Sequence, residues 1–252
     1  MSATEYMNRI RDMIDALNHT SMPAVEEAAQ AMASSVAAGR AVYYYGSGHS
    51  VLPVLDVFPR YGSFVGLLPI YDPRLIWFNV IGPGGTPELL WLERQEGYVQ
   101  SVFRYYSIDS RDTLIVFSHG GLNAAGIEAA MIGKDRGATV VAVTSMQNYG
   151  QNAAKHSSGK KLADVADIVI DNGAPPEDAL IRIPDWAEPV AASATVMKVC
   201  ISMMLVAETA RILSSQGVYA PTFASPNVVE RASHDLEVYE AYRRFRHRLD
   251  EP

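Results

Sequence analysis

The chain has 252 residues, of which 48% are hydrophobic and 19% charged, ordinary values for a globular protein with a substantial core. Its net charge of −7 argues against non-specific binding to nucleic acid or to an acidic membrane surface. Cys200 is the single cysteine, which excludes an intrachain disulfide and suits the reducing cytoplasm. The amphipathic start carries acids and is not a secretory signal, and the apolar stretch 190–212 contains charges that favour a buried helix over a membrane span.

The first 39 residues predict a helical hairpin. Met7, Ile10, Met13 and Leu17 recur at steps of three and four residues, which is typical of an amphipathic helix. After a break, Pro23 can begin a second helix over residues 25–38, which Gly39 ends.

A strand and a Gly/Ser loop follow the hairpin. Residues 42–45 are one valine and three tyrosines, typical of a buried strand, and an apolar segment with helical spacing begins at residue 51. Glycines between them let the backbone approach a ligand, and the exposed N–H groups at a helix N-terminus favour an anion. The residues of this first loop are Gly46, Ser47, Gly48, His49 and Ser50.

The next segment is less regular. Residues 64–70 and 76–80 are short apolar runs that predict strands, and the glycines and prolines of 82–87 predict a surface loop. Residues 88–106 look helical.

A second strand, loop and helix then repeat the order and chemistry of the first unit. The strand is predicted at 113–117 and the helix at 124–136. Its polar loop consists of Ser118, His119, Gly120, Gly121, Leu122 and Asn123.

Two further strands are predicted at 140–143, which ends in Thr144 and Ser145, and at 168–170. The polar residues 147–161 between them predict a long loop, and 172–189 shows no strong periodicity. The longest helix is predicted at 191–214, with Val196, Val199, Cys200, Met203 and Ala207 on one face, and a charged helix at 227–248.

Alternating strands and helices predict an α/β fold, a three-layer sandwich with a central, mostly parallel sheet. Ligands of such sheets lie beyond the carboxyl ends of the strands. Three polar loops follow strands of this sheet, beginning at Gly46, Ser118 and Thr144, and are expected to converge on one pocket.

The sequence of these strands and loops resembles that of the sugar isomerase (SIS) family of phosphosugar-binding domains. The resemblance rests on GSGHS at 46–50, on LIVFSHGGLNAAGIEAA at 114–130 and on VVAVTS at 140–145. Within that family the sequence looks most like the sugar-isomerase-domain proteins related to phosphoheptose isomerase. Three segments carry this likeness: LERQEG at 92–97, HSSGKKL at 156–162 and VADIVIDNGAPPEDAL at 165–180. It implies a doubly wound, flavodoxin- or Rossmann-like fold, which we expect to form a single domain over 1–252.

The resemblance also implies how a phosphate is held. Ser47, Ser50 and backbone N–H groups would come from the first loop, the second loop would be the main cradle, and Thr144 and Ser145 would complete the rim. Family members usually have serine at the first and third positions of the second loop, then glycine, and threonine, serine or asparagine at the sixth. Ser118, Gly121 and Asn123 fit this pattern, but Gly120 replaces the second serine. Either the amides and His119 compensate, or the anion differs from a simple phosphate.

Aldose–ketose isomerisation needs a base that moves a proton between adjacent carbons and an acid that serves the carbonyl oxygen. The candidate bases are Glu93, Glu96 and Asp56. Glu93 and Glu96 are three residues apart and could share one face of a helix, although an exposed pair would do the same. His49 and His119, in the two loops, are candidates for phosphate binding or acid–base catalysis.

Phosphoheptose isomerase has a catalytic histidine on its C-terminal helix, and the matching stretch 198–208 has none, which puts heptose isomerisation itself in doubt. Lys198 could approach the site, but we expect its charged end to reach out to solvent. No His, Cys or acid spacing predicts a metal site, and GSGHSV lacks the third glycine of a dinucleotide fingerprint, so no cofactor is expected.

The resulting hypothesis is a cytoplasmic enzyme that isomerises a sugar phosphate with a carboxylate base and a histidine acid. An amino-sugar phosphate lyase or deaminase, and a non-catalytic phosphosugar sensor, remain as alternatives. SIS domains usually pair, which implies a homodimer or homotetramer with a face formed by the long apolar helix and the N-terminal helices. The expected partners are a small sugar phosphate and further copies of the chain, without nucleic acid or membrane.

Overall fold

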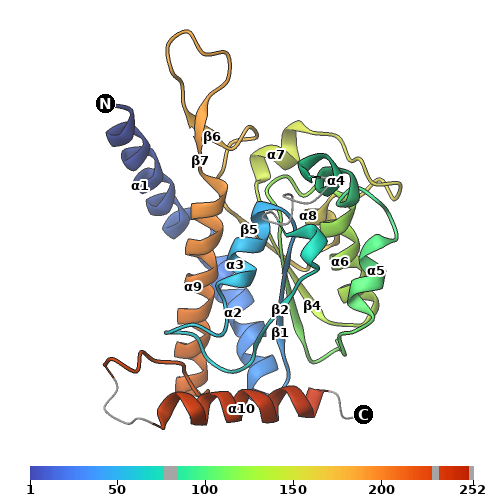
Figure 1. Cartoon of the computed structure of the whole chain (residues 1–252), viewed down its shortest axis with the longest axis vertical. Coiled ribbons are helices and arrows are strands. Elements are labelled where there is room, and N and C mark those ends of the chain that lie inside the picture. The colour runs from blue at the N-terminus through green and yellow to red at the C-terminus, as the bar shows by residue number, and fades with distance from the viewer. Residues whose placement is uncertain (77–84, 229–232, 250–252) are drawn as a thin grey trace.

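The computed structural model describes residues 1–76, 85–228 and 233–249 (Figure 1). Its centre is a five-stranded sheet in the order β2-β1-β3-β4-β5, in which all neighbours are parallel. This is the flavodoxin-like doubly wound order, so the predicted α/β fold is confirmed. The strands are β1 (Val42–Gly46), β2 (Leu67–Ile70), β3 (Thr113–Phe117), β4 (Thr139–Thr144) and β5 (Ile168–Asp171).

Helices cover both faces of the sheet, which makes the molecule three-layered (Figure 1). Helices α2 (Met22–Ala37) and α9 (Ala194–Ser215) pack together on one face, and α5 (Tyr98–Phe103) and α6 (Ala124–Asp135) lie on the other. Every residue of β1 and β3 is therefore buried. This explains why both strands are continuous runs of apolar, aromatic and β-branched residues without a polar alternation.

The direction of winding reverses between β1 and β3. From β1 the chain moves outward to β2, then returns to place β3 on the other side of β1, and continues to β4 and β5. The register pairs Gly46 with Phe117, so the loops that follow these two residues leave the sheet side by side. Ligands of open α/β sheets bind at such a switch point.

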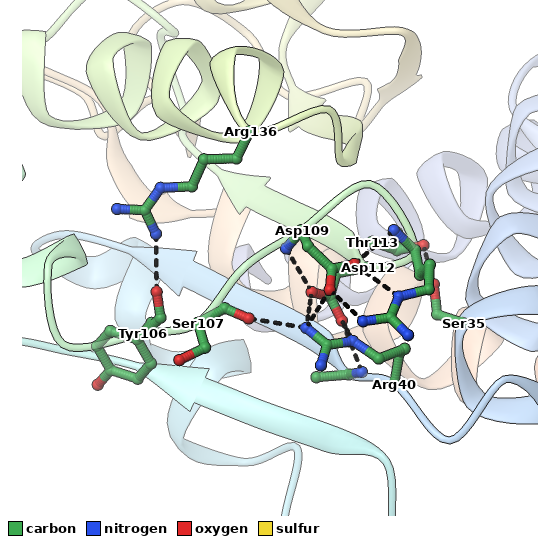
Figure 2. A network of polar contacts seen from close by, with 10 residues as sticks. Ser35, Arg40, Tyr106, Ser107, Asp109, Asp112, Thr113 and Arg136 are labelled. Atoms are coloured by element: carbon green, nitrogen blue, oxygen red, sulfur yellow. Dashed lines mark hydrogen bonds and ion pairs between the residues drawn. The ribbon is translucent and has the colours of Figure 1, made fainter. Parts of the chain in front are cut away.

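A buried ion pair secures the segments that lead into β1 and β3 (Figure 2). Asp112, only 1% exposed, accepts hydrogen bonds from Nε and Nη2 of Arg40 at 3.2 and 2.7 Å. The same carboxylate accepts from the backbone N–H groups of Ala41 and Asp109 at 2.9 and 2.7 Å. Four donors thus satisfy a charge that would otherwise be costly to bury.

Two N-terminal helices, α1 (Ser2–Thr20) and α2, and the charged terminal helix α10 (His234–Leu249) are all present. Only Ser21 separates α1 from α2, and α2 continues in the general direction of α1, so the two helices do not fold back on each other as the predicted hairpin (Figure 1). After the first loop the chain forms the short helices η1 (His49–Val51) and α3 (Leu52–Leu55), and η2 (Pro73–Leu75) follows β2.

Two segments expected to be irregular contain regular structure. The first third of the predicted loop 147–161 is helical, in α7 (Met146–Gln151), and α8 (Leu162–Val165) follows the loop. The segment 172–189 forms most of a projecting arm in which β6 (Ala179–Ile181) pairs antiparallel with β7 (Val190–Ala192) (Figure 1). Strands this short carry too few residues for a period to be read from the sequence.

The single helix predicted over 88–106 is wrong, because two helices occupy this region, α4 (Gly85–Leu92) and α5. Gly97 separates them with a φ of 83°, which a helix interior cannot contain. Residues 85–87, expected in a surface loop, begin α4, while 82–84 lie outside the described residues. Of the strand predicted at 76–80, only Ile76 is described, as a bridge partner of Gly48.

The apolar face of α9 that the spacing identifies is not the face that packs into the core. Met197, Ile201 and Leu205 point into the core, whereas Val196 is 39% exposed and Cys200 is only partly buried. Both faces of this helix are apolar, so its period could not decide which one packs on the sheet.

Candidate functional site

The first loop makes a tight turn at the end of β1. A Cβ atom on Gly46 would lie 2.2 Å from the backbone oxygen of Ser50, so only glycine allows this close approach. Gly48 has a φ of 55° and donates its N–H to the carbonyl of Leu75 at 2.8 Å. The turn thereby presents the side chains of Ser47 and Ser50 at the carboxyl end of the sheet.

Glu93 is held between the two loops. It follows α4, is 7% exposed, and accepts hydrogen bonds from Ser47 Oγ at 3.0 Å and from Asn123 Nδ2 at 2.7 Å. Burial raises the pKa of this carboxyl, while the Ser47 hydrogen bond and the charge of Arg94 oppose the shift. A buried carboxylate with a raised pKa and a fixed orientation has the properties of a general base.

The second loop is shaped by one glycine and one hydroxyl. Gly121 has a φ of 63° and donates its N–H to Ser118 Oγ at 3.1 Å. A Cβ atom at Gly121 would meet Thr144 Oγ1 at 3.1 Å and the side chain of Leu162 at 3.2 Å. The loop leads directly into α6, whose first residue is Ala124. Its backbone N–H groups and the α6 N-terminus can receive an anion.

Gly120 and His119 also belong to the second loop. A Cβ atom at Gly120 would be 3.3 Å from Asn148 Nδ2, so Asn148 borders the space that a side chain at position 120 would occupy. The Nε2 atom of His119 lies 3.0 Å from the carbonyl of Pro176, and because a carbonyl only accepts, Nε2 carries the proton. Nδ1 is buried and has no partner within the described residues, so it can donate to a ligand only when the ring is charged.

Lys198 is in the core of the site, and the prediction that it reaches solvent is wrong. Its side chain is 1% exposed, and Nζ donates to Ser50 Oγ at 2.8 Å. Burial lowers the pKa of Lys198 to about 8, against the opposing charge of Asp178. Asp178 has a φ of 62° and caps α9 by accepting from the N–H groups of Ser193 and Ala194 at 3.0 and 2.5 Å.

These groups surround one cavity of about 390 Å³ at the carboxyl ends of β1 and β3. This volume is typical of small-molecule binding sites. Within the described residues its lining consists of Ser47, Gly48, His49, Ser50, Leu90, Glu93, Ser118, His119, Gly120, Gly121, Leu122, Asn123, Lys155, Asp178 and Lys198. Most residues of both predicted loops, and Glu93, are thus brought together.

Several predicted site residues lie elsewhere. Asp56 directly follows α3, pairs with Arg60 and does not line the cavity. Thr144 Oγ1 donates to the carbonyl of His119 at 3.2 Å, and Ser145 Oγ to that of Ala174 at 2.6 Å, so both hydroxyls support the loops from behind.

Glu96 does not share a helix face with Glu93, because the chain turns between α4 and α5. Its exposed carboxylate accepts from the backbone N–H of Ser157 at 2.7 Å and from the Ser157 hydroxyl. These hydrogen bonds lower the pKa of Glu96, the opposite of the direction at Glu93. The two carboxylates therefore occupy different environments although they are neighbours in sequence.

Asp178, Lys155 and Lys198 are cavity residues that sequence reasoning either passed over or placed outside the site. The sequence contains one indication that Lys198 could be a site residue, because it is a lone cation in the apolar part of a long helix. Asp178 and Lys155 lie in segments without periodicity, so only the folded chain brings them to the cavity. Within the described ranges no three His, Cys, Asp or Glu residues are arranged to hold a metal ion, and no helix there is long and apolar enough to cross a membrane.

The doubly wound sheet and a polar cavity at its switch point define a class of α/β protein that binds small ligands between two Gly-containing loops. Residues 5–145 match the SIS domain model, and the chain belongs to the SIS domain family. A UPF0309 protein of Thermoanaerobacter pseudethanolicus is 31% identical over 95% of this chain and 97% of its own length. Another, from Oceanobacillus iheyensis, is 30% identical over 95% and 96%.

A phosphoheptose isomerase from Francisella tularensis has a similar fold, with a TM-score of 0.52. The two share 16% sequence identity, and the match covers 83% of this chain and 96% of that one. At this identity the likeness concerns the fold alone.

Proposed function

We propose that the chain binds a sugar phosphate in this cavity and catalyses aldose–ketose isomerisation with Glu93 as the base. The observation that carries the proposal is the position of Glu93, buried beside both loops and held by Ser47 and Asn123. Burial keeps water from the carboxylate and raises its pKa, which makes it a better proton acceptor than an exposed acid.

The phosphate is assigned to the second loop. Its N–H groups and the α6 N-terminus supply donors without a net positive charge, which suits a chain whose net charge is −7. Lys155 adds an exposed cation at the cavity rim. With the phosphate there, the sugar lies towards Glu93, because Asn123 belongs to the loop and also contacts that carboxylate.

The proposal is tested with hexose, pentose and heptose phosphates and their unphosphorylated parents. We expect a phosphorylated sugar, but not its parent, to raise the melting temperature. With that sugar in deuterated water, NMR should detect exchange of the proton on C2, and Glu93→Gln should abolish it.

The same measurements separate the alternatives. Stabilisation without exchange would favour a phosphosugar sensor. Release of ammonia or of the C3 substituent from an amino-sugar phosphate would favour the deaminase or lyase. No stabilisation by any phosphate would contradict the phosphate cradle itself.

We further propose that the chain acts as a homodimer or homotetramer in the cytoplasm. The outer face of α9 supports the assembly, because Val196, Cys200 and Met203 form an apolar stripe that stays partly exposed. The lone cysteine is consistent with a reducing compartment. Light scattering at micromolar concentration tests the assembly, and a monomer there contradicts it.

A further inference from the structure

Lys198 is a buried cation whose position serves no evident packing purpose. A lysine is almost never fully buried unless it is paired. Within the described part of the chain, Nζ makes one hydrogen bond, to the hydroxyl of Ser50, and no ion pair. Its side chain nevertheless lines the cavity. A charge placed at this cost beside a ligand cavity is expected to act on the ligand.

The first loop relates Lys198 to Glu93. Ser47 Oγ contacts Glu93 and Ser50 Oγ contacts Lys198, so one five-residue turn orients both an acid and a base. The two side chains come from segments far apart in sequence, Glu93 from the residue that follows α4 and Lys198 from the first turns of α9. The turn thus holds two ionisable groups of opposite type at one cavity.

We propose that Lys198 is the catalytic acid, which donates its proton to the carbonyl oxygen of the substrate while Glu93 acts on the adjacent carbon. This inference rests on the proposed function and replaces the histidine acid expected from the sequence. His49 is exposed, and the Nε2 proton of His119 is directed at Pro176, which leaves Lys198 as the best-placed buried donor.

The proton transfers balance. Glu93 removes the proton from C2 of the aldose, the C–H electron pair forms the C1–C2 double bond, and the carbonyl pair moves to O1, which takes a proton from the Lys198 ammonium. The neutral amine then accepts the proton of the C2 hydroxyl as the C2 carbonyl forms. Glu93 returns its proton to C1, so both side chains end as they began.

The charges around Lys198 suit this role. Burial brings its pKa to about 8, so near neutral pH the ammonium is populated and yet gives up its proton readily. Asp178 favours the ammonium of Lys198. Partial burial, and after it the charge of Lys198, lowers the pKa of His49. The other titratable cavity residues are Glu93, His119 and Lys155.

The test compares wild type, Lys198→Met, Lys198→Arg and the exposed control Lys160→Met, with the sugar phosphates that show C2 exchange in the wild type. We expect kcat to fall at least ~100-fold in Lys198→Met, while stabilisation by inorganic phosphate persists. Wild-type kcat should decline as pH rises through the pKa of Lys198. Lys198→Arg should keep residual activity without that decline, and Lys160→Met should match wild type.

Each other outcome overturns the inference. A raised KM with unchanged kcat in Lys198→Met would make Lys198 a binding group. An adduct trapped on Lys198 by borohydride would indicate an imine instead of an acid. If kcat and the pH profile are unchanged in both Lys198 variants, Lys198 is not the catalytic acid, and the proposed function is unaffected. If the wild type does not exchange the C2 proton of any sugar phosphate, the proposed function is contradicted, and so is this inference.

Discussion

Ser47 donates a hydrogen bond from Oγ to Oε2 of Glu93 at 3.0 Å. The contact joins the turn after β1 to the end of α4, 46 residues further along the chain. A hydroxyl in this position stabilises the ionised carboxylate, whereas burial of the carboxyl has the opposite effect. Burial therefore raises the pKa of the proposed base, the Ser47 hydrogen bond and the charge of Arg94 oppose the shift, and the Ser47 contribution can be removed by mutation.

We expect Ser47→Ala to move the acid limb of the kcat/KM pH profile to higher pH. The hydrogen bond from Ser47 lowers the pKa of Glu93, so its loss raises that pKa further, and the base becomes protonated at a higher pH. Ser34→Ala, which removes an exposed hydroxyl on α2, is the matched control and should leave the limb in place. If the acid limb does not move in Ser47→Ala, then Ser47 does not influence the pKa of the catalytic base.

Glu93→Gln is expected to increase the melting temperature near neutral pH. The folded pKa of Glu93 lies above its ordinary value of 4.5, so its contribution to stability is full below that value and is lost as pH rises through the folded pKa. The uncharged glutamine avoids this loss. Thermal melts at about pH 7.5 and about pH 4 should show the advantage only at the higher pH.

The control for that comparison is Glu27→Gln, which changes an exposed glutamate of α2. It should show no comparable dependence of the melting temperature on pH. A lower melting temperature for Glu93→Gln at about pH 7.5 would mean that the hydrogen bonds of the carboxylate outweigh its burial.

Gly46→Ala should disrupt the first loop. The new methyl group would lie 2.2 Å from the carbonyl oxygen of Ser50, a backbone atom, so the turn itself must shift. We expect loss of activity by more than ~10-fold and destabilisation of about 1–3 kcal/mol. Gly150→Ala in α7 is the control, because nothing lies within 4 Å of its Cβ position and alanine favours a helix by ~0.5–1 kcal/mol. Equal effects of the two changes would contradict the close approach at Gly46.

The Arg40–Asp112 pair should be a strong determinant of stability that leaves the chemistry alone. Asp112→Ala removes the buried carboxylate that accepts two hydrogen bonds from Arg40, leaves Arg40 only the partly exposed Asp109 at 3.0 Å, and leaves two backbone N–H groups without an acceptor, which costs about 3–5 kcal/mol. Arg111→Ala removes an ion pair whose arginine is 62% exposed, and should cost less than ~1 kcal/mol. Urea denaturation measures both, and similar values for the two would argue against the role of burial.

Local patterns were sufficient for the elements that carry the fold. The tyrosine-rich run of β1 and the apolar run of β3 are each followed by glycine-containing loops, and a parallel sheet brings such loops to the same edge. The first loop, the second loop and Glu93 could therefore be assigned to one pocket from sequence and family resemblance together. The alternation of strand and helix predicted the parallel sheet, whereas the doubly wound order, now confirmed, was implied by the family resemblance.

Local patterns failed where the outcome depends on distant partners. Glu93 and Glu96 look alike in sequence, but a left-handed turn at Gly97 directs one inward and leaves the other exposed. The arm of β6 and β7 is stabilised by packing on α1, through Ile10, Leu180 and Ile181, and has no local signal of its own.

The sequence alone therefore determined the strand and helix alternation and the two polar loops, because these depend on residues close together in the chain. Only the tertiary structure decided whether the side chain of Lys198 is buried or exposed. Its helix is apolar on both faces, so the packing of α9 against α2 and α3 selects the face that turns inward and carries the amine to Ser50. Burial then changes the proton affinity of that amine, a property that exists only in the folded chain.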